Sequence, residues 1–328
     1  MKFRKVIIGV GLFLSTINYQ QSTVFAQSHQ KAGTTGAQIL EVKPGTRPAA
    51  MGGAFVAISD DANALNYNPA GLAFLKDKEL QLNQNNYYGE AIVSNINGVY
   101  PLSEAHAKDV YDLGVIAGGF TYVNYGKLAG RDATGADTGE FGAQDRVITV
   151  GYGTSFSPNY SLGVTGTEIR QEIFGLEAKG YSFNAGFLVK GLLDNILNIG
   201  LAAQNMGSKI GFENEKQSLP TNIVLGGALN LANDRLIFTA DLNKPVNDYY
   251  YWRMGSEFLL TKILALRIGY NTKHDAGNGL SGGVGIVLHE FDYAFVPFSE
   301  LAINYAYVPY GDLGVDHRIE LVIKMGVE

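Results

Sequence analysis

The stretch LALRIGYN, residues 264–271, alternates strictly between two kinds of side chain. The large apolar set is Leu264, Leu266, Ile268 and Tyr270, and the small or polar set is Ala265, Arg267, Gly269 and Asn271. Because successive side chains of a β-strand point to opposite faces, this period of two predicts a strand with one apolar face. The same pattern recurs over residues 236–242, 250–260, 280–288 and 317–325.

Two features favour a transmembrane β-barrel over the alternative, a soluble β-sandwich. The apolar face is continuous, whereas the opposite face is rich in glycine and charge, as expected for a barrel lumen. Aromatic residues also gather at strand ends, where rings with a polar tip meet lipid headgroups. These are Tyr87, Tyr88, Tyr122, Tyr125, residues 249–252, Tyr305, Tyr307 and Tyr310. Lipid cannot satisfy an open sheet edge, so the sheet must close.

The length of the alternating region sets the size of the barrel. Spanning strands of about 9–11 residues, with their turns, give residues 78–328 roughly 14 strands in an antiparallel all-β fold. We expect one barrel domain and longer polar loops at 128–145, 207–218 and 273–279, all on one side of the membrane.

The N-terminus predicts export. Three basic residues at positions 2–5 precede an apolar stretch at 6–17, and small side chains stand at Val24 and Ala26. This pattern is typical of a secretory signal peptide over residues 1–26. We therefore expect cleavage after Ala26, outer-membrane localisation with lipid as a partner, and an exposed leader over residues 27–43. The leader and the segment after it, residues 27–77, would form a unit preceding the barrel.

Composition excludes several activities. The net charge is −6 without a basic cluster after the signal segment, so no nucleic-acid partner is expected. Cysteine is absent, which removes thiolate catalysis and Cys–zinc sites. The five histidines lack metal-ligand spacing, and no nucleophile–base set stands out. We predict no enzymatic activity, no cofactor and no metal site, although calcium binding by the acidic 128–145 loop stays open.

Charged residues on the small-residue face should point into the lumen. They are Asp241, Arg253, Glu257, Arg267, Asp292, Arg318, Glu320 and Lys324. Both signs are interleaved, which favours a network that braces a plug. A solute path through the lumen is the alternative.

One stretch does not alternate: PGTRPAAMGGAFVAISDDANALNYNPAGLAFL, residues 44–75. It consists largely of small residues, so we expect it to lie inside or against the barrel as a plug. Asp60 and Asp61 offer a carboxylate pair for acid–base work. The interpretation we favour is that one of them caps a short helix over residues 62–65.

This stretch resembles the N-terminal signature of the PorV/PorQ family of FadL-like outer-membrane barrels. The resemblance rests on the ordered set Pro44–Ala57, Asp60–Ala64 and Asn68–Leu72. Its motif residues are Pro48, Met51, Gly52, Gly53, Asp60, Asp61, Asn68, Pro69, Ala70 and Gly71. Later matches are Leu219–Pro220, Asp241 with Pro245, Leu266–Tyr270 and Asp292–Ala294.

The resemblance implies a 14-stranded barrel with an N-terminal plug or hatch. It also implies a place in type IX protein secretion, in which PorV-like members receive cargo from the translocon and pass it to an attachment complex. The partners would be that translocon and the sorting domains of cargo. FadL-like relatives imply the alternative, passive transport of hydrophobic small molecules. The resemblance does not separate a PorV-like from a PorQ-like role.

Overall fold

The computed structural model describes residues 34–87, 90–102, 113–213, 215–273, 276–293 and 296–326, and the side chains of residues 290–297 fall outside that description. These residues form fourteen strands. They are β1 (Lys78–Asn86), β2 (Ile92–Pro101), β3 (Val115–Arg131), β4 (Asp137–Ser157), β5 (Tyr160–Ile173), β6 (Leu176–Gly191), β7 (Leu197–Gly207), β8 (Asn222–Leu231), β9 (Leu236–Pro245), β10 (Tyr251–Leu259), β11 (Leu264–Asn271), β12 (Leu280–Tyr293), β13 (Val296–Pro309) and β14 (Val315–Met325).

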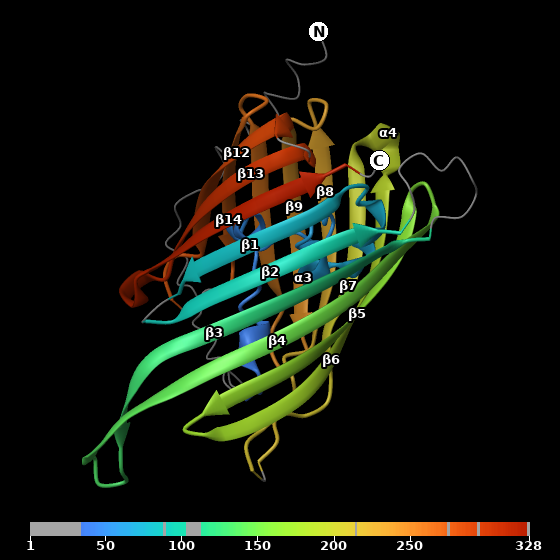
Figure 1. Ribbon diagram of the computed structural model, residues 1–328. Helices are drawn as coiled ribbons and strands as arrows, with labels where there is room; N and C mark the ends of the chain where they lie inside the picture. Colours follow the sequence, from blue (N-terminus) through green and yellow to red (C-terminus); the bar gives the residue numbers. More distant parts are fainter. Residues whose placement is uncertain are drawn as a thin grey trace, which may run out of the picture. The chain divides into compact units, whose positions relative to one another are not determined.

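The strands close into a single antiparallel barrel (Figure 1). Each strand pairs with its neighbours in sequence, and β1 pairs with β14 from Lys78↔Met325 to Asn86↔His317. The predicted all-β barrel of about 14 strands is confirmed. Because the strands run up and down in order, the β3–β4 turn and the connections at 208–221 and 272–279 share one end of the barrel. We call this the hairpin end; β1 begins and β14 ends at the terminal end.

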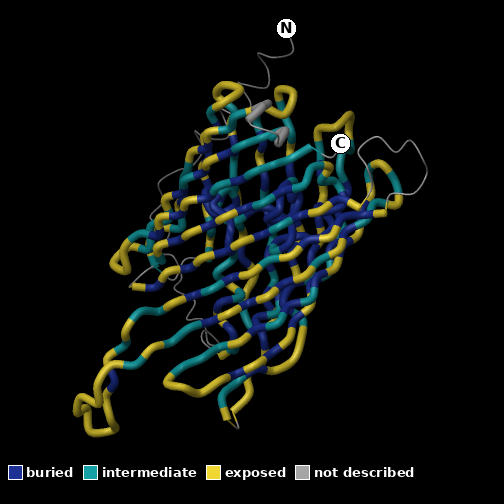
Figure 2. Tube along the Cα trace, viewed as in Figure 1, coloured by how far each residue is buried: buried dark blue, intermediate teal, exposed yellow. Residues whose placement is uncertain are grey.

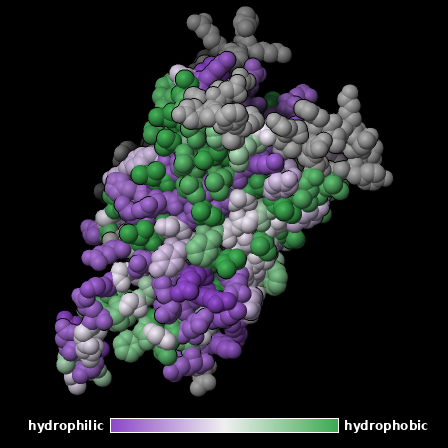
Figure 3. Space-filling view, in the orientation of Figure 1, coloured by the Kyte–Doolittle hydropathy of each residue, from purple (hydrophilic) through white to green (hydrophobic). Residues whose placement is uncertain are grey.

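Burial alternates along the strands, as Figure 2 shows. On β1 the inward residues Glu79, Gln81, Asn83 and Asn85 are buried, whereas Leu82 is exposed on the outside. Large apolar side chains on most other strands are also exposed outwards, and Figure 3 shows them gathered on the barrel wall. Such an apolar exterior is suited to lipid rather than water.

The longest strands form a hairpin that extends at one side of the barrel. β3 has 17 residues and β4 has 21, and only residues 132–136 separate them. The predicted loop at 128–145 is therefore wrong, because most of it is paired strand, from Lys127↔Gly142 to Gly130↔Gly139. Its glycines and charges are compatible with an exposed two-stranded ladder, which needs no apolar face.

Short helices supply the rest of the regular structure. η1 (Gln38–Leu40), α2 (Thr46–Ala50), α3 (Ala64–Tyr67) and η2 (Pro69–Phe74) precede the barrel. α4 (Leu192–Asn195) and η3 (Gly311–Leu313) lie in strand connections. No helix in the described part of the chain is long and apolar enough to cross a membrane.

The prediction of an exposed leader over residues 27–43 is wrong for the last of these residues. Ala37 and Ile39 are buried in one cluster with Val93, Val123 and Ile169 from the barrel wall, and Leu40 and Val42 pack against it. These apolar side chains meet inward-facing valines and isoleucines, so the hydrophobic effect holds them in place. Residues 27–33 of the expected leader, the signal segment and its cleavage site lie outside the described residues.

Candidate functional site

The segment at residues 44–75, called the inner segment below, contacts inward-facing side chains all around the barrel. Arg47 is its hub. Its guanidinium donates two hydrogen bonds of 2.8 Å to the two carboxylate oxygens of Glu257 on β10. It also donates to Asp60 and, at 2.9 Å, to Asp61 within the segment. One arginine therefore folds the segment on itself and ties it to the wall.

The network continues from Glu257 across neighbouring strands. Glu257 accepts a hydrogen bond from Arg267 at 2.5 Å, and Arg267 donates to Asn304 at 2.8 Å. Asn304 donates to Glu320 at 3.0 Å, and Glu320 returns to the inner segment by accepting the Thr46 amide at 3.2 Å. Groups of opposite charge are thus linked through hydrogen bonds, with the Asn304 amide between Arg267 and Glu320.

Wall carboxylates also hold the backbone of the inner segment. Asp241 on β9 accepts the amides of Phe55 and Val56 at 2.9 and 3.1 Å. Glu79 on β1 accepts the amide of Ala62 at 2.9 Å. Hydrogen bonds of this kind satisfy backbone donors that have no partner in a regular helix. Sequence reasoning missed Glu79, which its inward parity on β1 could have revealed.

The remaining predicted lumen charges have other partners. Arg318 donates to Asp316 at 2.7 Å and to the Lys43 carbonyl at 3.0 Å. Lys324 forms an ion pair with Glu300 at 2.9 Å. Arg253 donates to the Tyr251 hydroxyl at 3.1 Å and lines a cavity. Asp292 lies in β12, but its side chain is outside the described residues.

The Pro48–Gly53 part of the motif forms a tight turn against the wall. Met51 is fully buried, and Gly52 has a φ of 66° and donates its amide to the Ser281 hydroxyl at 3.1 Å. Gly53 has a φ of 80°. Only glycine adopts such angles freely, and the Cβ of any other residue at position 52 would also meet the backbone of Tyr270.

The Asn68–Gly71 part of the motif begins η2. Asn68 accepts the Ala70 amide at 3.2 Å and donates to the carbonyls of Val56 and Phe187 at 2.9 and 3.2 Å. Pro69 occupies the first helical position, which suits its missing amide. The Ala70 carbonyl accepts a 2.8 Å hydrogen bond from Ser161 on β5.

The acidic pair braces the segment. Both carboxylates bond to Arg47, and Asp61 also accepts the Asn63 amide at 2.9 Å. The expected capped helix over 62–65 is shifted, because α3 begins at Ala64 and neither carboxylate is its N-cap. Burial opposes ionisation of Asp60, but the attraction of Arg47 and then Lys190 outweighs it and holds the pKa of Asp60 well below its usual range.

Glycines on the inward face of the wall allow the segment to come close. A Cβ at Gly163 would overlap Pro69, one at Gly269 would overlap Gly52, and one at Gly200 would overlap Val56. The sequence indicated only that glycine is common on the inward face. It did not indicate that these glycines are matched to particular turns of residues 44–75.

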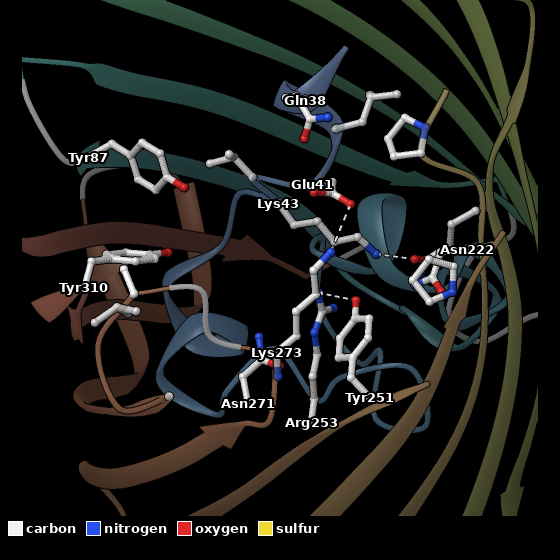
Figure 4. Close-up of a pocket in the computed structure, with 18 of the residues that line it drawn as sticks. Gln38, Glu41, Lys43, Tyr87, Asn222, Tyr251, Arg253, Asn271, Lys273 and Tyr310 are labelled. Carbon is white, nitrogen blue, oxygen red and sulfur yellow. Dashed lines mark hydrogen bonds and ion pairs between the residues drawn. The ribbon is translucent and has the colours of Figure 1, made fainter. Parts of the chain in front are cut away.

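A cavity of about 370 Å³ lies at the hairpin end (Figure 4). Residues 38–43 form one side, and the ends of the strands from β7 to β13 form the others. Three tyrosines that we assigned to the headgroup region, Tyr87, Tyr251 and Tyr310, line it instead. Tyr249, Tyr250, Trp252 and Tyr307 are exposed, whereas Tyr88 is outside the described residues.

Among the described residues, no cluster of three or more acidic or histidine side chains could hold a metal. At the β3–β4 turn, Asp132 accepts the amides of Thr134 and Ala136 at 2.8 and 2.9 Å and so supports its own turn. The histidines that the structure describes, His289 and His317, lie within β12 and β14, and His317 contacts the Tyr305 hydroxyl at 2.8 Å.

Solved structures of similar fold include two toluene transporters and a hydrocarbon channel. The Ralstonia pickettii toluene transporter TbuX gives a TM-score of 0.56 at 14% identity, covering 87% of this chain and 98% of that chain. The Pseudomonas putida toluene transporter TodX gives 0.54 at 13% identity, covering 86% and 97%. The CymD monoaromatic hydrocarbon channel gives 0.54 at 12% identity, covering 86% and 97%. The comparison with curated proteins found no match.

The closed barrel and its apolar exterior define the class of protein, a 14-stranded transmembrane-type β-barrel, and the likeness to these solved structures is one of fold. The model of the family described as "Type IX secretion system protein PorV" matches residues 25–246. The chain belongs to the PorV family and is an outer-membrane barrel of type IX secretion.

Proposed function

We propose that this barrel works as a protein-binding component of type IX secretion, receiving secreted cargo at the outer membrane, and that it has no enzymatic activity. The observation that carries the proposal is the bracing of the inner segment by charged and polar groups on many strands, through Arg47–Glu257, Asp241 and Glu79. A segment held in this way acts as a plug and favours a closed lumen. The working surface would then be the outside and the mouth of the barrel.

The partners in this proposal are the translocon and the sorting domains of cargo. The long β3–β4 hairpin at the hairpin end supports it, because exposed strands can pair with the edge of another β-domain. This end would face the cell exterior. The chain would arrive by a cleaved signal peptide at residues 1–26, with residues 27–77 as leader and plug and residues 78–328 as the barrel.

Passive transport of hydrophobic small molecules is the second candidate, favoured by the fold shared with TbuX and TodX. Displacement of residues 44–75 would have to expose a path in that case. The exposed surfaces of the lumen would then be carboxylates, guanidinium groups and amides, which are poor neighbours for a hydrocarbon. We therefore place this function second.

Purification from native outer membranes tests the proposal. A tagged chain should co-purify with a large translocon barrel and with secreted proteins that carry a β-sandwich sorting domain. A variant that lacks residues 125–143 and joins Asn124 to its cross-strand partner Gln144 by Asn-Gly should lose cargo while keeping its heat-modifiable mobility on gels. Recovery of the folded barrel without any secretion protein would contradict the proposal.

A further inference from the structure

The cavity at the hairpin end carries an excess of positive charge. Its charged lining residues are Lys43, Arg253, Lys273 and Glu41. Three cations thus face one carboxylate, in a chain whose net charge is −6. A smaller cavity deeper in the barrel shares Glu41, Lys43 and Arg253 and adds Arg318. The positive lining therefore extends from the mouth towards residues 44–75.

Two of these cations have no carboxylate partner among the described residues. Lys273 is 3.1 Å from Asp248 and 3.6 Å from Glu41, so it is neutralised locally. Lys43 instead bonds to the amide oxygen of Gln204 at 2.5 Å. Arg253 bonds to the Tyr251 hydroxyl, and its buried Nε has no hydrogen-bond partner among the described residues. Neither Lys43 nor Arg253 forms an ion pair within the described part of the chain.

Asp241 on β9 is the cross-strand neighbour of Arg253, but no ion pair joins the two side chains within the described residues. One oxygen of Asp241 accepts the amides of Phe55 and Val56, and the other has no hydrogen-bond partner there. The Arg253 guanidinium lies near the Tyr251 ring, 5.3 Å from its centroid, and lines the cavity (Figure 4). Partly buried cations without counter-ions are costly, so a bound anion would stabilise this arrangement.

We infer that this cavity binds a small organic carboxylate, held between Lys43 and Arg253 with its apolar body against the tyrosines. Guanidinium groups bind carboxylates through paired hydrogen bonds, and Arg253 has an unused donor for one. Tyr251 and Tyr310 supply ring faces, and Asn222 and Asn271 supply amides. A cavity of 370 Å³ lies within the range of small-molecule sites.

The electrostatics of Lys43 agree with this assignment. Burial and then the charge of Arg253 hold the pKa of Lys43 well below its usual value. An anion between the two groups would offset both effects. The inference does not rest on the proposed role in secretion, because it concerns a free small molecule and can be tested on the isolated barrel.

The test uses the purified full-length chain in detergent, with benzoate as the probe and benzamide as its neutral isostere. Calorimetry should detect benzoate binding, with benzamide weaker by about tenfold or more, the loss expected when a charge-assisted pair is missing. Lys43→Gln and Arg253→Gln should each weaken benzoate binding by a similar factor. Arg131→Gln, at the distant β3–β4 turn, should leave it unchanged and serves as the control.

Heat-modifiable mobility on a gel checks that each variant is folded. Lys43 precedes the barrel strands, so Lys43→Gln keeps the test valid even if Arg253→Gln does not fold. Equal affinity for benzoate and benzamide would overturn the inference. So would unchanged benzoate binding by Lys43→Gln, or inorganic phosphate binding as tightly as benzoate.

Discussion

Arg47 and Glu257 form a two-bond ion pair, 2.8 Å at each bond, that joins the inner segment to the barrel wall. The residues are 210 positions apart in sequence, and both side chains are largely buried. Arg267 approaches the same carboxylate from β11, so Glu257 neutralises two guanidinium groups at once. Loss of this carboxylate would leave the buried Arg267 without an ion pair among the described residues, whereas Arg47 would keep Asp60 and Asp61.

Glu257→Gln should therefore destabilise the protein. Removing one partner of a buried pair costs about 3–5 kcal/mol, because the remaining charge is left uncompensated. Urea unfolding followed through Trp252, the single tryptophan, measures the change. Lys127→Gln is the matched control: it breaks the exposed ion pair with Glu140, and a change of no more than about 1 kcal/mol is expected. Equal effects of the two substitutions would contradict the bracing role of Glu257.

The pKa of Asp60 predicts how the inner segment responds to acid. Because this pKa is lower in the folded protein than in an unfolded chain, the carboxylate contributes stability above its ordinary pKa near 4 and loses it as the pH falls further. Protease accessibility of residues 44–75 should rise below about pH 4. Asp60→Asn should be more accessible at neutral pH and should show a smaller additional rise in acid. An identical acid response in both proteins would exclude Asp60 as its source.

Glycine at position 269 is required by the contact with the Met51–Gly52 turn. Gly269→Val should force this turn away and cost about 1–3 kcal/mol, the usual range for overpacking. Gly227→Val is the control, since a Cβ there meets nothing within 4 Å. Urea unfolding compares the two, and a larger loss of stability for the control would contradict this account of the wall glycines.

We predict that replacing Asn68 by alanine destabilises the protein. Its amide side chain satisfies two buried carbonyls, those of Val56 and Phe187, and starts η2. Asn68→Ala leaves these groups unpaired, at a cost of about 1–3 kcal/mol. Limited proteolysis should cut residues 44–75 faster in this variant. Asn66→Ala is a matched control because the Asn66 amide nitrogen has no hydrogen-bond partner among the residues that the structure describes.

The barrel could be predicted from sequence because its signal is repeated in every strand. Alternation such as that of Leu264–Asn271 fixed both faces, and the length of the chain fixed the approximate strand number. The same alternation could have assigned Tyr251 to the inside, since Tyr250 and Trp252 on either side of it face outwards. The face of the strand on which an aromatic residue lies therefore predicts its location better than its position at a strand end does.

The candidate site was harder to predict because its contacts join distant parts of the chain. Nothing near Gly163 indicates that it receives Pro69, and nothing near Ile39 indicates that it packs on β2 and β5. The parity of Glu257 and Arg267 placed them on the inward face, but their shared link to Arg47 depends on where residues 44–75 lie. Short polar segments have no periodicity from which such a position can be derived.

Deletion of the gene in the bacterium that carries it tests the central claim most directly. The measurement is the distribution of proteins with type IX sorting domains between the periplasm and the cell surface or medium. This account predicts that they accumulate in the periplasm and that the wild-type chain restores their release. Normal release in the deletion strain, together with reduced uptake of a hydrophobic probe, would contradict it and favour the transporter.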